Sequence, residues 1–207
     1  PGYGLSSGTP SEKGSYAAAD AAYDYLIAQG VRPEAIVMHG RSLGGAVMVD
    51  LASRRRAAGL VIESSFVSAY RVVTRVPLLP LDQFSSLRKL RDVHVPVLIV
   101  HGDRDEVIPF WHGRRLFDVV PADQRSALWV EGAGHNDLLE VAGERYWDAL
   151  KHPPTGEMPV FLANPDELRP VYPRLVQLHF KHYLAAAKLD PTLTPHKLRH
   201  SHATHLL

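Results

Sequence analysis

Apolar residues form short continuous runs along the first three quarters of the chain. The runs that are rich in Val, Ile and Leu and have the length of a strand cover residues 35–39, 59–63, 95–101 and 126–131. A strand that is apolar at every position is buried on both faces, as in a parallel sheet with helices on each side. The pattern therefore predicts an α/β fold with a parallel sheet covered on both faces.

Between these runs, apolar residues recur three or four positions apart, as on one face of a helix. The first such segment begins at Ser11, a residue type favoured at helix N-termini, and is expected to end at Gly30. Segment 66–94, with Pro77 and Pro80, is less regular, and we expect a helical insertion over the site. Further helices are predicted for residues 46–56, 110–119 and 137–150.

The pattern changes after Leu150, where the chain becomes rich in helix breakers. Residues 151–157 are predicted to be a linker between a domain at 1–150 and a short, mainly helical segment at 158–207. Formal charge changes from −2 in residues 1–150 to +3 in residues 151–207, a shift typical of segments of different origin. Beyond the linker, we expect a strand at 160–162 and helices at 173–189 and 194–207.

A glycine-rich turn separates the strand at 35–39 from the helix that follows it. Its sequence, Gly40-Arg41-Ser42-Leu43-Gly44, matches the nucleophile elbow, in which a serine lies on a strained strand-to-helix turn. Side chains two residues away would clash there, so glycine is expected at both flanking positions. The turn exposes the Ser42 hydroxyl and directs the Leu43 N–H to the same space as an oxyanion donor. The alternative is a glycine-rich turn with an incidental serine.

A serine nucleophile needs a base, and the base needs an orienting acid. In folds that carry a nucleophile elbow, the triad residues follow one another in the chain in the order serine, acid, histidine. We predict Asp105 as the acid, because it follows the buried strand at 95–101. Asp103 is the main alternative and Glu63 a third. An acidic turn that caps the next helix would explain the same residues without catalysis.

The base is predicted to be His135, which follows the last strand of the domain in Gly132-Ala133-Gly134-His135. Glycines before the histidine suit a loop that lets the ring reach both serine and acid. The other histidines of this domain lie on or beside strands or on a helix. These residues, His39, His94, His101 and His112, are expected to be packed or surface residues.

Four strings together resemble the α/β-hydrolase-domain serine hydrolases: residues 2–10, 39–45, 97–109 and 132–137. The resemblance covers roughly residues 1–150 and implies hydrolysis of an ester, thioester or amide through an acyl-serine. It also implies that the acid is the second Asp of the His-Gly-x-x-Asp pattern, here Asp105. No metal or organic cofactor is needed for this chemistry, and the expected partner is a small-molecule acyl substrate.

Members of that family have several strands before the Gly2-Tyr3-Gly4 loop, at which this sequence begins. The resemblance therefore implies that a second oxyanion N–H lies on a loop outside this sequence. Loss of one such donor costs about 10²–10³ in rate, so we expect weakened activity. We also expect the strand at 35–39 to be a sheet edge.

The segment from Thr194 to Leu207 is similar to the His-x-x-Arg box of tyrosine recombinases, or phage integrases. In that family His196 and Arg199 would hold the scissile phosphate, for which the arginine fork is suited. The sequence has no match to the first catalytic Arg region, the later His/Trp position or the nucleophilic Tyr. DNA or phosphate contact is therefore the most that we expect of this segment. A basic amphipathic helix is the alternative.

The chain has no cysteine, which excludes disulfides, thiolate metal sites and a cysteine nucleophile, and fits a cytoplasmic location. No apolar run approaches the roughly 20 residues that a membrane span needs. The sequence thus predicts a serine hydrolase segment fused to a partial recombinase segment. The alternatives are a DNA-recombination protein fragment and a non-functional fusion product.

Overall fold

The computed structural model describes residues 7–73, 83–151, 162–164 and 169–170 of the 207-residue chain. The chain divides into two compact units, Pro1–Val160 and Phe161–Leu207. In the second unit the described residues form an antiparallel pair, β5 (Leu162–Asn164) and β6 (Arg169–Pro170). Of the strand predicted for 160–162, Leu162 lies in β5, and residues 160–161 lie outside the described residues. The helices predicted for 173–189 and 194–207 lie outside the described residues, and the linker at 151–157 stays a prediction.

The first unit contains a parallel sheet in the order β1-β2-β3-β4, which confirms the predicted fold class. Arg41 pairs with Glu63 across β1 and β2, and Gly102 pairs with Val130 across β3 and β4. Since all strands run the same way, the loops that follow them meet at one edge of the sheet. The strands are β1 (Val37–Arg41), β2 (Gly59–Glu63), β3 (Val97–Gly102) and β4 (Arg125–Val130).

The helices predicted for the first unit are found, with changes at their ends. The Gly14 N–H donates to the Ser11 side chain at the start of the first helix, as expected of an N-cap. The segment at 137–150 was predicted to be one helix but forms two, because Gly143 adopts a φ of 54° that interrupts the helix. The main helices are α1 (Glu12–Ala28), α2 (Leu43–Ala52), α5 (Trp111–Val119), α6 (Leu138–Ala142) and α7 (Glu144–Lys151).

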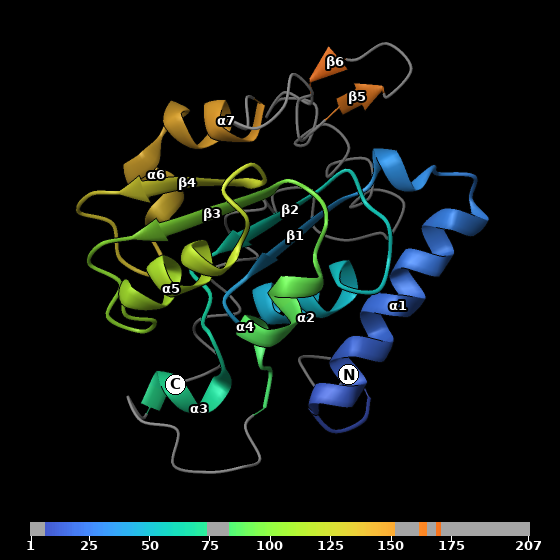
Figure 1. Ribbon diagram of the computed structural model, residues 1–207, viewed down its shortest axis with the longest axis horizontal. Coiled ribbons are helices and arrows are strands. Elements are labelled where there is room, and N and C mark those ends of the chain that lie inside the picture. Colours follow the sequence, from blue (N-terminus) through green and yellow to red (C-terminus); the bar gives the residue numbers. More distant parts are fainter. Residues whose placement is uncertain (1–6, 74–82, 152–161, 165–168, 171–207) are drawn as a thin grey trace, which may run out of the picture. The chain divides into compact units, whose positions relative to one another are not determined.

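The less regular segment at 66–94 contains short helices, as expected. They are α3 (Ala69–Val73), α4 (Ser86–Lys89) and the 3-10 turn η2 (Leu90–Asp92), and residues 74–82 lie outside the described part. A further 3-10 turn, η1 (Pro33–Ala35), precedes β1. Figure 1 shows α6 and α7 on one side of the sheet and α2, α4 and α5 on the other. Among the described residues, no helix combines the length and the apolar character that crossing a bilayer requires.

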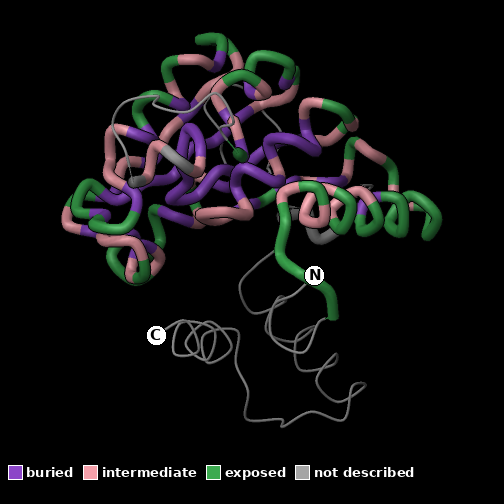
Figure 2. Tube along the Cα trace, turned by 90° about the horizontal axis from the view of Figure 1, so that it is seen from below, coloured by how far each residue is buried: buried purple, intermediate pink, exposed green. Residues whose placement is uncertain are grey.

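Burial follows the position of each strand in the sheet. Every residue of β2 and β3 is buried, whereas β1 and β4 alternate between buried and more exposed positions. In the described part of the chain β1 therefore lies at an edge, as expected for residues 35–39. Figure 2 shows the buried segments running through the middle of this unit.

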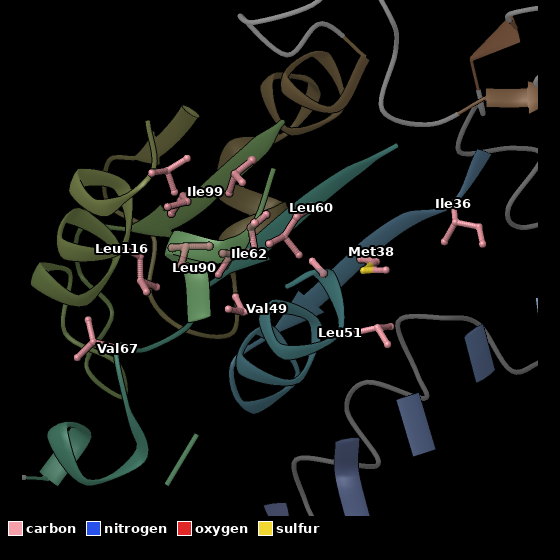
Figure 3. Close-up of a cluster of buried hydrophobic side chains, with 14 of the residues drawn as sticks. Ile36, Met38, Val49, Leu51, Leu60, Ile62, Val67, Leu90, Ile99 and Leu116 are labelled. Atoms are coloured by element: carbon pink, nitrogen blue, oxygen red, sulfur yellow. The ribbon is translucent and has the colours of Figure 1, made fainter. Parts of the chain in front are cut away.

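A cluster of buried side chains lies between the sheet and the α2 side of the unit (Figure 3). Leu60, Ile62 and Ile99 contribute from the two central strands, and Val49 and Leu51 contribute from α2. Burial of a side chain of this size contributes about 1.5–3 kcal/mol to stability. The core thus fixes the strand ends that carry the candidate site.

Candidate active site

Ser42 lies on the sharp turn between β1 and α2, in the strained backbone conformation that an elbow requires. Its φ is 51° and its ψ is −122°, a region that side-chain-bearing residues rarely adopt and that costs about 1–3 kcal/mol. Three hydrogen bonds hold it there. The Ser42 N–H donates to the Glu63 carbonyl (2.9 Å), and the Ser42 carbonyl accepts from Ser65 Oγ (2.7 Å) and from the Gly45 N–H (3.0 Å).

The close approach that the elbow needs is made at Gly40 and Gly45. A Cβ on Gly40 would lie 2.2 Å from the Gly44 carbonyl oxygen, and one on Gly45 would lie 2.5 Å from Ser65 Oγ. A Cβ on Gly44 would meet no atom within 4 Å. The expectation that glycine is needed on both sides of Ser42 is therefore right for Gly40 and wrong for Gly44, because the Gly44 side position points into open space.

Leu43 is the first residue of α2. The first N–H groups of a helix have no acceptor within the helix, and its N-terminus carries a partial positive charge. The position of Leu43 at this helix N-terminus is compatible with the predicted role of its N–H as an oxyanion donor, which stays a prediction.

Asp105 and His135 are in direct contact: His135 Nδ1 lies 2.7 Å from Asp105 Oδ2. The other carboxylate oxygen accepts from the backbone N–H groups of Val107 (2.9 Å) and Ile108 (2.7 Å). Burial raises the pKa of Asp105, but hydrogen bonds from His135 and Ile108 outweigh it, so the pKa lies below its ordinary value. An ionised Asp105 keeps the proton on His135 Nδ1 and leaves Nε2 free to act as a base.

The two alternative acids have other partners. Asp103 Oδ1 accepts from the Gly132 N–H (2.7 Å), which ties the loop after β3 to the loop that carries His135. Glu63 is buried and contacts His39 Nε2 (3.2 Å), Tyr146 Oη (2.7 Å) and Arg41 Nε (3.3 Å). Of the three candidate carboxylates, Asp105 is the one that the structure places against His135.

Arg41 and Asn136 are site residues that sequence reasoning missed. Arg41 Nη2 donates to the His135 carbonyl (2.6 Å) and to Asn136 Oδ1 (2.8 Å). The signal for Arg41 was available, since it is the one charged residue in the turn Gly40-Arg41-Ser42-Leu43-Gly44. Asn136 carried no such signal, because polar residues are usual in a loop.

His101 and His112 are fully buried, as expected of packed histidines. His101 Nε2 lies 2.8 Å from the Ile108 carbonyl and 3.6 Å from Asp105 Oδ2, so it packs beneath the turn that holds the acid. Burial lowers the pKa of His101. Within the described residues, no group of three or more His, Asp or Glu side chains is arranged to hold a metal ion.

His112 makes the folded state sensitive to acid. Burial, with the charge of His101, lowers its pKa from 6.5 to about 4, and its Nδ1 accepts from the Val67 N–H (3.2 Å), a bond that protonation would break. At a pH between these two pKa values the unfolded chain binds more protons than the folded chain. The folded state therefore loses stability as the pH falls from 6.5 towards 4. The loss from this group is roughly 3 kcal/mol.

We expect the variant His112→Asn, whose amide oxygen can still accept from Val67, to show a flatter fall in unfolding free energy over this range. Urea denaturation at pH 7 and pH 4.5 measures it. His94→Asn, at an exposed position, is the control and should follow the wild-type curve. An equally steep fall in His112→Asn would contradict the assignment.

The parallel sheet, the strained serine turn and the contact of His135 with Asp105 together form the arrangement of the α/β-hydrolase fold. Solved structures share the fold: a monoacylglycerol lipase from Paleococcus ferrophilus (TM-score 0.56, 21% identity, covering 72% of this chain and 78% of that one) is one example. An α/β serine hydrolase homologue from Coxiella burnetii is another (TM-score 0.55, 20% identity, 71% of this chain and 63% of that one). The chain is 44% identical over 162 residues to mouse alpha/beta hydrolase domain-containing protein 17C.

That match covers 76% of this chain and 49% of the mouse protein, so the chain spans about half the length of the curated relative. No protein-family model matches the chain. The comparisons give no support to the resemblance of residues 158–207 to tyrosine recombinases. His196 and Arg199 lie outside the described residues, so a phosphate or DNA contact there stays a prediction.

Proposed function

We propose that the chain carries the catalytic triad of a serine hydrolase that cleaves an ester, thioester or amide through an acyl-serine. Ser42 is the nucleophile, His135 the base, Asp105 the orienting acid, and the Leu43 N–H an oxyanion donor. The observation that carries the proposal is the 2.7 Å contact of His135 Nδ1 with the buried, ionised carboxylate of Asp105. Arg41 connects the loop that carries His135 to the turn that carries Ser42.

In the first half-reaction Ser42 Oγ attacks the acyl carbonyl while His135 Nε2 takes the hydroxyl proton. Negative charge moves to the carbonyl oxygen, where the Leu43 N–H donates to it. When the tetrahedral intermediate collapses, the bond to the leaving group breaks, and the leaving group takes the proton from His135. This leaves an acyl-serine and a neutral His135.

In the second half-reaction water attacks the acyl-serine, with His135 Nε2 again taking a proton. Collapse releases the carboxylic acid and returns the proton to Ser42 Oγ. Throughout, the carboxylate of Asp105 stabilises the imidazolium and keeps Nδ1 protonated. Each step thus uses three side chains and one backbone N–H of the described residues, together with the substrate and one water.

The test is labelling with a fluorophosphonate, which phosphonylates a serine that its base has activated and releases fluoride. We expect the probe to label the purified chain, and mass spectrometry to place the adduct on the peptide that contains Ser42. Ser42→Ala should abolish labelling, whereas Ser53→Ala, at the end of α2, should label as the wild type does. A folded chain that stays unlabelled, or is labelled equally in Ser42→Ala, contradicts the proposal.

A further inference from the structure

Arg41 is the side chain that connects the nucleophile turn with the loop of the base. It directly precedes Ser42 in the chain, and its Nη2 donates to both the His135 carbonyl and Asn136 Oδ1. We propose that Arg41, anchored by Glu63, is a positioning residue that sets the place of His135 relative to Ser42. This inference rests on the proposed function, because it assigns a role towards the same triad.

Glu63 is a firm anchor for the guanidinium. It ends β2, a strand in which every residue is buried, and its side chain is only 4% exposed. Its Oε2 accepts from Tyr146 of α7 (2.7 Å) and lies 3.2 Å from His39 Nε2 of β1, and its Oε1 lies 3.3 Å from Arg41 Nε. The carboxylate is thus held from two other elements before it meets the arginine.

The charge state of Glu63 agrees with this role. Burial raises its pKa, but the hydrogen bond and charge of His39, the hydrogen bond from Tyr146 and the charge of Arg41 outweigh it, and the pKa lies below its ordinary value. Glu63 is therefore ionised at neutral pH. A buried carboxylate without a cationic partner destabilises the folded state, so Glu63 favours the guanidinium of Arg41 at this position.

Glu63 holds both sides of the site at once. Its backbone carbonyl accepts from the Ser42 N–H (2.9 Å), and its side chain holds the arginine that binds the His135 carbonyl. A shift of the guanidinium would move the base without moving the nucleophile. Since misplacement by about 1 Å can cost 10² in rate, this link matters for catalysis even though it touches no substrate.

Arginine suits this link because its charge is spread over a planar group that reaches both partners. Its planar guanidinium forms an ion pair with Glu63 while Nη2 donates to the His135 loop, whereas a lysine ammonium is one point charge on a flexible stem. We therefore expect Arg41→Lys to restore little of what Arg41→Gln loses.

The experiment measures steady-state hydrolysis of p-nitrophenyl esters and the rate of fluorophosphonate labelling for Arg41→Gln and Arg41→Lys. We expect kcat and the labelling rate to fall about 10- to 100-fold, with KM changed less than about threefold. Asn136→Ala removes one acceptor of Arg41 but keeps the Arg41–Glu63 pair, so it tests the link in a variant that should still fold. We expect its kcat and labelling rate to fall about threefold to tenfold. Arg54→Gln is the control, since Arg54 makes similar contacts to Asp20 and Asp50 away from the site.

A spectroscopic readout separates positioning from general stability. In the wild type the His135 Nδ1 proton, shared with Asp105, should give a downfield proton resonance, which we expect to broaden or shift in Arg41→Gln but not in Arg54→Gln. Wild-type rates in folded Arg41→Gln, or equal losses in Arg41→Gln and Arg54→Gln, would overturn the inference. If the wild type shows no Ser42-dependent labelling, the proposed function itself fails.

Discussion

Asp105→Asn is expected to lower kcat about 10⁴-fold while the chain stays folded. The reason lies in how the two carboxylate oxygens are used. Oδ1 accepts from the Val107 and Ile108 N–H groups, so an asparagine must place its carbonyl oxygen there. Its NH₂ group then faces His135 Nδ1, which must accept. The ring proton moves to Nε2, and His135 can no longer take the proton of Ser42.

The measurement is kcat against pH for Asp105→Asn beside the wild type, on an ester that the wild type hydrolyses. Asp103→Asn is the matched control, because its amide oxygen can still accept from the Gly132 N–H. We expect that control to stay within about threefold of the wild type. Equal losses in the two variants would show that the loop, and not the tautomer of His135, was disturbed.

The strands, most helices of the first unit and the contact of Asp105 with His135 could be predicted because each has a local cause in the sequence. Continuous apolar runs specify buried strands, and Ser42, Asp105 and His135 each follow such a run. The break at Gly143 was missed because the amphipathic pattern continues across it. A single glycine inside such a pattern is compatible with both an intact helix and a break.

The network around Glu63 could not be predicted, because its members come from distant parts of the chain. His39 and Arg41 lie in β1, Glu63 in β2 and Tyr146 in α7, and only the packing of the sheet brings them together. Sequence reasoning weighed Glu63 as a triad acid, since it ends a strand. Its partners show that a carboxylate at a strand end can serve equally as an anchor.

A comparison of Gly40→Ala with Gly44→Ala tests how tightly the elbow is packed. Both glycines belong to the Gly-x-Ser-x-Gly pattern, but their surroundings differ. A Cβ on Gly40 would lie 2.2 Å from the Gly44 carbonyl oxygen and 2.7 Å from Gly45 Cα, and both are backbone atoms that cannot rotate away. We expect Gly40→Ala to destabilise the chain by about 3 kcal/mol, at the upper end of the usual overpacking cost.

Gly44→Ala should have the opposite sign. Its Cβ would meet no atom within 4 Å, and the position lies in the first turn of α2, where alanine favours the helix by up to about 1 kcal/mol over glycine. Urea denaturation of both variants at pH 7 gives the two free energies. If they change equally, the serine turn is less tightly packed than its geometry indicates. If only Gly40→Ala is destabilised, contact between β1 and the start of α2 is what holds Ser42 in its strained conformation.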